Sequence, residues 1–229
     1  MCSSDLLAVI IQDGIRRMYV DQESIFYYLT VMNEQYAMPM MPDGSRDGIL
    51  KGLYRFRPSS MPDANARAQL FGSGAILPEV IKAQEILESK YNVGADVWSV
   101  TSYNELYREG HACERWNVLH PGDAPRVPYV TQCLKDAPGV FIAASDYVKM
   151  LPAAIDKWLP RPLTALGTDG FGRSENRAGL RDFFEVDYRY VIVATLAALA
   201  REGQIEKAVV DQAFKDHGVN PEKANPAVS

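Results

Sequence analysis

Three side chains that often bind metal ions or act as nucleophiles lie close together, at His111, Cys113 and His120. Structural zinc needs four ligands, usually supplied as two closely spaced pairs. The spacing of these residues matches no such pair, and Cys133 is the one candidate for a further ligand elsewhere in the chain. We therefore expect structural roles for these residues. Ser145 follows a predicted strand but lacks the glycines of a Gly-x-Ser-x-Gly nucleophile elbow, which argues against hydrolase chemistry.

Two glycine-rich runs could bind an anion through backbone amides. Gly72–Gly74 lies between a predicted strand and a predicted helix, but the third glycine of the dinucleotide fingerprint is missing and no Gly-Lys-Ser/Thr follows. Pro78, in the first helical turn, favours a tight turn instead. Gly167–Ser174 follows another strand, and Ser174 is placed to cap the next helix. We expect its glycines to serve backbone geometry and Arg173 to be a packing or interface charge.

The best candidate for a binding loop runs from Asn33 to Pro39. It follows Ser24–Met32, a stretch rich in β-branched and aromatic residues that predicts a buried strand. Loops at strand ends often carry binding sites. Asn33 and Glu34 supply polar groups there, and a turn-forming role is as consistent with them as a site-lining role.

Alternating apolar segments predict the scaffold that positions these loops. Expected strands cover residues 66–72, 95–100, 139–144 and 162–166, and expected helices cover 78–91, 102–118 and 127–135. This alternation predicts an α/β fold, a mostly parallel sheet covered by helices. Asp187 is placed to cap a long helix that Gly203 ends, and a last helix over 205–217 would pack outside it.

The first part of the chain differs in pattern. Apolar residues at helical spacing predict a helix from Leu7 to Tyr19. Two apolar runs, 53–57 and 66–71, flank a Pro- and Ser-rich connection and suggest a hairpin that opens a second domain. With the boundary between Asp43 and Lys51, residues 1–46 form the end of a preceding α/β domain and residues 47–229 form the main domain.

Bulk properties exclude several classes of protein. The chain has 229 residues, 47% of them hydrophobic, and a net charge of -5 with scattered lysines and arginines, which gives no sign of nucleic-acid binding. The longest uncharged apolar stretch, Tyr190–Ala200, is far shorter than the roughly 20 residues that cross a bilayer. Met1–Asp5 has no basic region of a secretory signal, and the 3 cysteines lack paired spacing. We expect a cytoplasmic protein with free thiols and no membrane helix.

One run has no explanation in composition or periodicity. Cys113–Asn117, followed by Leu119–Pro121, resembles the first, pyruvate-decarboxylating component of the homodimeric type of pyruvate dehydrogenase complex. Further blocks follow in the order of that family along nearly the whole chain: Ile11–Tyr19, Tyr27–Thr30, Asn33–Glu34, Met38–Pro39, Gly72–Gly74, Val100–Ser102 and Gly167–Ser174. Met1–Asp5 looks foreign to the pattern.

The resemblance implies what each part does. Family members are much longer, so we expect a piece of such a protein: the end of the middle, pyrimidine-binding-type domain and a transketolase-like C-terminal domain. The family decarboxylates pyruvate on thiamine diphosphate with Mg²⁺ and passes the acetyl unit to a lipoyl group on the acetyltransferase component. The resemblance also implies a homodimer, and it places the loop with Asn33 and Glu34 on the substrate side of the cofactor.

The sequence departs from the family at two points. The thiamine diphosphate signature, a Gly-Asp-Gly opening a segment that ends in Asn-Asn, is missing: Gly122-Asp123 is followed by Ala124, and Asp169-Gly170 lacks the preceding glycine. We therefore expect no catalytic, cofactor-binding or metal-binding residue here and no cofactor bound by this chain alone. Some family members also have a histidine where Ala37 stands.

Two alternatives stay open. A stand-alone domain could mediate dimerisation or docking without chemistry of its own, and the reading frame upstream of Met1 distinguishes this from the enzyme. Another transketolase-type enzyme with a different donor is the second, and the run from Cys113 to Pro121 argues against it.

Overall fold

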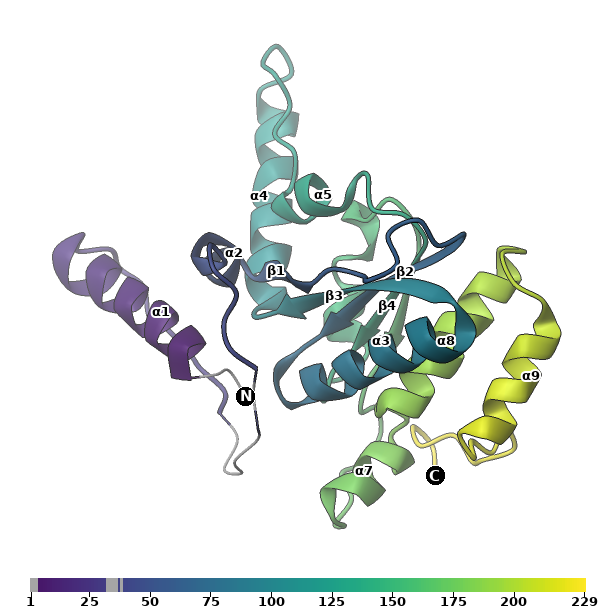
Figure 1. The fold of residues 1–229 in the computed structure, drawn as a ribbon. Helices are drawn as coiled ribbons and strands as arrows, with labels where there is room; N and C mark the ends of the chain where they lie inside the picture. Colours follow the sequence, from purple (N-terminus) through teal and green to yellow (C-terminus); the bar gives the residue numbers. More distant parts are fainter. Residues whose placement is uncertain (1–3, 32–36, 38) are drawn as a thin grey trace.

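A five-stranded sheet forms the centre of the molecule (Figure 1). The computed structural model describes residues 4–31, 37 and 39–229. The strands are β1 (Leu53–Arg57), β2 (Ala66–Gly72), β3 (Val93–Val100), β4 (Val140–Ala144) and β5 (Leu163–Leu166), in the order β1-β3-β2-β4-β5. β1 is antiparallel to β3 and every other pair is parallel. The predicted fold, a mostly parallel sheet covered by helices, is confirmed.

Helices cover both faces of this sheet, which is why its central strands are apolar on both sides. On one face Leu70 and Ile142 pack with α3 (Leu77–Tyr91) and α8 (Tyr188–Arg201), and α9 (Lys207–Asp216) lies outside α8. On the other face Phe71 and Phe141 pack edge to face, with ring centroids 6.0 Å apart, beneath α4 (Tyr103–Leu119) and α5 (Tyr129–Leu134).

Of the two predicted N-terminal helix caps, one is present and one is not. Asp187 caps α8 by accepting from the Arg189 amide, as predicted, and Ser102 caps α4 by accepting from the Glu105 amide. The prediction that Ser174 caps the next helix is wrong. That helix, α7 (Arg177–Phe183), begins later, and the Asn176 side chain accepts from the Gly179 amide.

The predicted hairpin is also wrong. Both of its strands exist, but β1 pairs with β3, and β2 lies between β3 and β4. The connection over residues 58–65 is tied down by the buried carboxylate of Asp96 and by Glu88, which accept from the amides of Ser59 and Ser60. It therefore leads β2 past β3 instead of turning it back on β1.

The N-terminal part packs on the β1 side of the sheet. α1 (Ser4–Ile15) and a π-helical turn, η1 (Arg16–Val20), confirm the predicted helix, and α2 (Arg46–Lys51) leads into β1. Leu6, Val9, Ile49 and Tyr54 form a small core between them. The remaining short elements are η2 (Gly74–Ile76), α6 (Met150–Ala153) and η3 (Asp156–Trp158).

The prediction of a buried strand at Ser24–Met32 is wrong over the described residues 24–31. They form no strand, and Phe26 and Tyr28 are 87% and 84% exposed. Two of their side chains are anchored: the Tyr27 hydroxyl donates to the Asp13 carboxylate over 2.7 Å, and the Thr30 hydroxyl lies 2.6 Å from the Tyr147 hydroxyl. No strand in the described part of the chain lies beside this segment to supply hydrogen bonds, so its strand propensity is unused.

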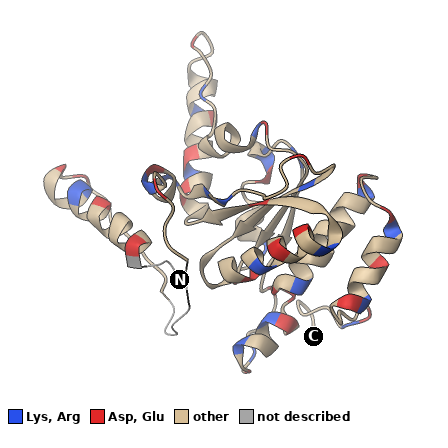
Figure 2. Cartoon of the chain, in the orientation of Figure 1, with Lys and Arg blue, Asp and Glu red and all other residues tan. Residues whose placement is uncertain are grey.

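Charged residues of both signs are interspersed along the helices (Figure 2). None of the helices in the described part combines the length and the apolar composition needed to cross a membrane.

Candidate functional site

Most of the predicted binding loop lies outside the described residues. Asn33 and Glu34 are among the residues that are not described, so a substrate-side role for them stays a prediction. Ala37 is described and exposed. Pro39 and the preceding residues 28–30 line a cavity next to the sheet.

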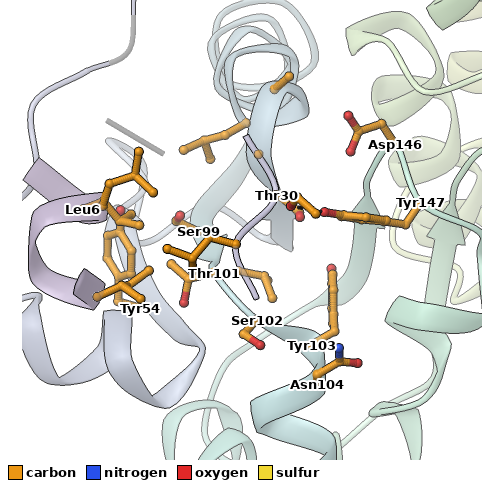
Figure 3. Close-up of a pocket in the computed structure, with 18 of the residues that line it drawn as sticks. Leu6, Thr30, Tyr54, Ser99, Thr101, Ser102, Tyr103, Asn104, Asp146 and Tyr147 are labelled. Atoms are coloured by element: carbon orange, nitrogen blue, oxygen red, sulfur yellow. Dashed lines mark hydrogen bonds between the residues drawn. The ribbon is translucent and has the colours of Figure 1, made fainter. Parts of the chain in front are cut away.

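This cavity, called the edge cavity below, has a volume of about 420 Å³ and lies at the carboxyl ends of β2, β3 and β4 (Figure 3). Such strand ends, near the point where the strand order reverses, are where open α/β sheets usually bind ligands. Residues that follow the three strands form one side of it: Ser73–Ala75, Thr101–Asn104 and Asp146–Tyr147. Leu6, Leu7 and Ile10 of α1 and the segment 28–30 form the other.

The turn after β2 is tight, as predicted for Gly72–Gly74. A Cβ at Gly72 would lie 2.9 Å from the Cα of Leu77, and Gly74 has a left-handed φ of +53°. η2 then leads directly into α3, with Pro78 in the first turn. The turn therefore brings α3 close to β2, and its glycines serve that close approach.

The turn after β3 contributes hydroxyl groups, most of which are occupied. The Thr101 hydroxyl donates to the Ile49 carbonyl over 2.7 Å, and the Ser102 hydroxyl caps α4. Tyr103 differs: it is 3% exposed, and its hydroxyl has no hydrogen-bond partner among the described residues. Burial raises the pKa of this phenol, which is therefore a neutral donor.

The loop after β4 closes the remaining side. The Tyr147 hydroxyl lies 2.6 Å from the Thr30 hydroxyl, so this loop is joined to the N-terminal segment. The Thr168 amide donates to the Tyr147 carbonyl over 2.8 Å, and a Cβ at Gly167 would lie 2.5 Å from the same oxygen. The start of the Gly167–Ser174 run thus holds the β4 loop in place.

The rest of that run packs against the C-terminus of the chain. Gly170 has φ +94°, and a Cβ there would lie 2.7 Å from the Pro226 carbonyl. Arg173 lies over the Phe183 ring, 5.2 Å from its centroid, and donates to Ser229. The predicted packing role of Arg173 and the geometric role of Gly167 and Gly170 are confirmed, whereas a Cβ at Gly172 would meet no atom within 4 Å.

His111, Cys113 and His120 lie along α4 and just after it, each in contact with other groups. The His111 ring is 3.1 Å from the Glu114 carboxylate, and the Cys113 thiol donates to Glu109. Burial, followed by that hydrogen bond to Glu109, raises the pKa of Cys113 to about 11. Within the described residues no group of three or more His, Cys, Asp or Glu could hold a metal ion.

The run Cys113–Pro121, which composition and periodicity do not explain, lies at the C-terminal end of α4. Trp116 is stacked between the His120 ring, 3.6 Å away, and the Arg126 guanidinium, 3.4 Å from its centroid. The Asn117 side chain pairs with the backbone of Arg126 in both directions, at 2.7 and 2.9 Å. These contacts fold residues 116–126 back on themselves as an arm that projects from the body (Figure 1).

A second cavity of about 500 Å³ lies between η1, residues 24–29 and the start of α4. Its charged groups are already paired: Arg17 contacts Glu23 at 2.6 Å and Tyr27 at 3.1 Å, and Asp13 accepts from Tyr27 and Arg16. The edge cavity, with an unpartnered donor, is therefore the stronger candidate for a binding site.

Sequence patterns did not single out Tyr103, Asp146 or Tyr147 as site residues. The available signal was their position, directly after the strands predicted at 95–100 and 139–144.

Two family models and several curated proteins match the chain. The model of the transketolase-like TK C-terminal domain matches residues 52–187, and the model of the pyruvate dehydrogenase E1 component middle domain matches residues 2–39. The chain is 50% identical over 221 residues to the pyruvate dehydrogenase E1 component of Pseudomonas aeruginosa and 47% identical over 225 residues to that of Escherichia coli K12. These matches cover 96% and 97% of the chain and 25% of each relative, so the chain spans about a quarter of their length.

Solved structures with a similar chain include a transketolase from Pichia stipitis, with a TM-score of 0.49, 15% identity, and coverage of 72% of this chain and 20% of that one. A transketolase from Leishmania mexicana has a TM-score of 0.46, 18% identity, and coverage of 69% and 19%. The two family models and the identity to curated relatives agree with each other. The chain therefore belongs to the family of pyruvate dehydrogenase E1 components and carries their transketolase-like C-terminal domain over residues 52–187.

Proposed function

We propose that the chain is the C-terminal part of an enzyme that decarboxylates pyruvate on thiamine diphosphate and transfers the acetyl unit to a lipoyl group of an acetyltransferase component. Its own contribution is structure and assembly of a homodimer in the cytoplasm. The observation that carries this proposal is the 50% identity over 221 residues to a curated pyruvate dehydrogenase E1 component.

The proposal divides the chain at residue 46. Residues 1–46 are the end of a middle domain and residues 47–229 are the C-terminal domain. The two family matches, 2–39 and 52–187, lie on either side of this boundary and support it.

The residues of this chain do not fit the cofactor. The edge cavity has no Lys or Arg among its described lining residues, and Asp146 is their one carboxylate. A diphosphate with Mg²⁺ needs several oxygen ligands for the metal and donors for the phosphates. In this proposal the cofactor site therefore lies in the part of the enzyme that the chain does not include.

Calorimetry with thiamine diphosphate and Mg²⁺ tests the assignment. We expect no measurable binding by the 229-residue chain and clear binding, with pyruvate decarboxylation, by the product of a longer reading frame that includes it. Micromolar Mg²⁺-dependent binding by the chain alone would contradict the argument from its residues. A reading frame that starts at Met1 would favour the non-catalytic dimerisation or docking domain.

The loop with Asn33 and Glu34 has its own test in the full-length enzyme. Replacing the exposed Ala37 with histidine adds an imidazole that can donate to the pyruvate carboxylate, worth about 1–3 kcal/mol with good geometry. We expect an altered KM for pyruvate and an unchanged melting temperature. If both stay unchanged, the loop is not on the substrate side.

A further inference from the structure

The edge cavity contains a hydrogen-bond donor that the described part of the chain leaves unused. The Tyr103 side chain rises from the start of α4 with its hydroxyl directed toward the Thr30–Tyr147 pair (Figure 3). It is 3% exposed, and no described residue accepts its proton. Buried polar groups normally have a partner, so a donor of this kind marks a place where an acceptor is missing.

The residues around Tyr103 indicate what kind of molecule could supply the missing acceptor. Aromatic and aliphatic side chains line much of the cavity, among them Tyr54, Phe56 and Leu77. Hydroxyl-bearing residues dominate the polar lining, among them Ser73 and Ser99. Apolar walls with a few converging polar groups are typical of small-molecule sites, and about 420 Å³ lies within their usual range of roughly 300–1,000 Å³.

The charge of the lining residues also limits which molecules the cavity can bind. Asp146 is the one ionisable acid among the described lining residues, and none of them is Lys or Arg. No hydrogen bond or ion pair joins the Asp146 carboxylate to another residue of the described part. A carboxylate repels anions and accepts from hydroxyl groups, so the lining disfavours phosphorylated or carboxylated molecules.

We propose that the edge cavity binds an uncharged polyhydroxylated small molecule, of the sugar or polyol class. One hydroxyl oxygen accepts from Tyr103 and another hydroxyl donates to Asp146. The C–H faces of the molecule pack against Tyr54 and Phe56. Thr30 and Tyr147, whose hydroxyls are 2.6 Å apart, join the two sides of the cavity next to Tyr103 and separate to admit it. The site is independent of the proposed enzymatic function.

Saturation-transfer NMR on the 229-residue chain tests the site with glucose, xylose and myo-inositol, and with gluconate and glucose 6-phosphate as anionic counterparts. We expect binding of at least one neutral compound and weaker binding of the anions. Absence of signal from all three neutral compounds, or tighter binding of an anion than of its neutral counterpart, overturns the proposal.

Two tyrosines on α4 form a matched pair of variants. Tyr103→Phe removes the unused donor, and Tyr107→Phe removes the hydroxyl of a residue that is 43% exposed and does not line the cavity. We expect Tyr103→Phe to weaken binding by about tenfold and Tyr107→Phe to leave it unchanged. Equal affinity of the Tyr103→Phe variant overturns the role of this hydroxyl.

The melting temperature without ligand gives an independent readout. A buried hydroxyl without a partner costs stability, so Tyr103→Phe should melt at the same temperature as the original chain or higher. A clear fall in melting temperature would mean that the hydroxyl already has a partner within the protein, and this too overturns the proposal.

Discussion

At the scale of single residues, Asp96 of β3 holds a buried network of hydrogen bonds together. One carboxylate oxygen accepts from Arg67 over 2.8 Å and from the Gln69 amide over 3.1 Å, and the other accepts from the Ser59 amide over 2.9 Å. Gln69 in turn accepts from the Trp98 indole over 2.7 Å. Removing the charge from such a buried pair leaves an uncompensated cation.

We expect Asp96→Asn to lower the free energy of unfolding by about 3 kcal/mol, because Arg67 loses its buried counter-charge. Arg108→Ala is the control, since it breaks an exposed pair with Glu105 and should cost less than about 1 kcal/mol. Urea unfolding measures both, and equal losses would contradict the role given to the buried network.

A second prediction concerns the turn at Gly72. Gly72→Ala places a Cβ 2.9 Å from backbone and side-chain atoms of Leu77, so α3 must shift, and we expect a loss of about 1–3 kcal/mol. Gly172→Ala meets no atom within 4 Å and should be nearly neutral. Thermal unfolding of both variants separates a steric effect from a general cost of replacing glycine.

Among the candidate site residues, position could be predicted but partners could not. The sequence indicates which residues follow strands, and the structure brings Ser73, Thr101 and Asp146 to one edge as expected of parallel strands. The Thr101 hydroxyl donates to the Ile49 carbonyl, whereas the Tyr103 hydroxyl has no partner among the described residues. This difference depends on contacts between residues far apart in the sequence. No local pattern encodes such contacts.

At the scale of elements, we expect the docking of α9 to depend on pH. His217 lies at its end, with its ring nitrogen 2.9 Å from the Tyr91 hydroxyl of α3. Tyr188, Lys90 and Asp216 also surround this histidine. Burial, and next the Lys90 charge, lowers the pKa of His217 below its ordinary 6.5.

Because the folded pKa is below the unfolded one, the unfolded chain binds more protons between the two values. The stability that His217 contributes is therefore fully present above about pH 6.5 and is lost as the pH falls below it. We expect the melting temperature to fall over this range, and His217→Gln to reduce the fall. Melting curves from pH 7.5 to 5, measured at constant ionic strength, provide the comparison.

Most elements of the main domain were predictable within a few residues. Apolar periodicity identifies α3 and α4, and the capping residue Asp187 marks the start of α8. Strand order was not predictable, because β1 and β2 have the composition of a hairpin while the partner of β1 comes later in the chain. The prediction for residues 24–31 is wrong for a related reason. Their composition favours a strand, but a strand forms only where another strand is available to pair with it.

At the scale of the whole molecule, the exposed apolar segment 24–31 should cause self-association. Phe26 and Tyr28 are large and almost fully exposed, and Ile11 and Ile15 of α1 are exposed as well. We expect the purified chain to sediment as a dimer or larger species at micromolar concentration.

Phe26→Asp should shift this equilibrium toward the monomer. Phe171→Asp is the matched control, since Phe171 is 83% exposed but belongs to the Gly167–Ser174 run and not to segment 24–31. Sedimentation velocity distinguishes them: a monomeric unmodified chain, or an equal effect of both substitutions, would argue against association through this segment.

The strand order also has a kinetic consequence. β1 precedes β2 in the chain but can pair only with β3, so during synthesis it stays unpaired until residues 93–100 have emerged. β2, α3 and β3 form a parallel strand–helix–strand unit whose paired residues are closer in sequence, and such local contacts form faster than distant ones. We expect pulse-labelled hydrogen exchange during refolding to protect the β2–β3 ladder before the β1–β3 ladder. The N-terminal part is connected to the sheet through α2 and β1, so we expect its amides to become protected last.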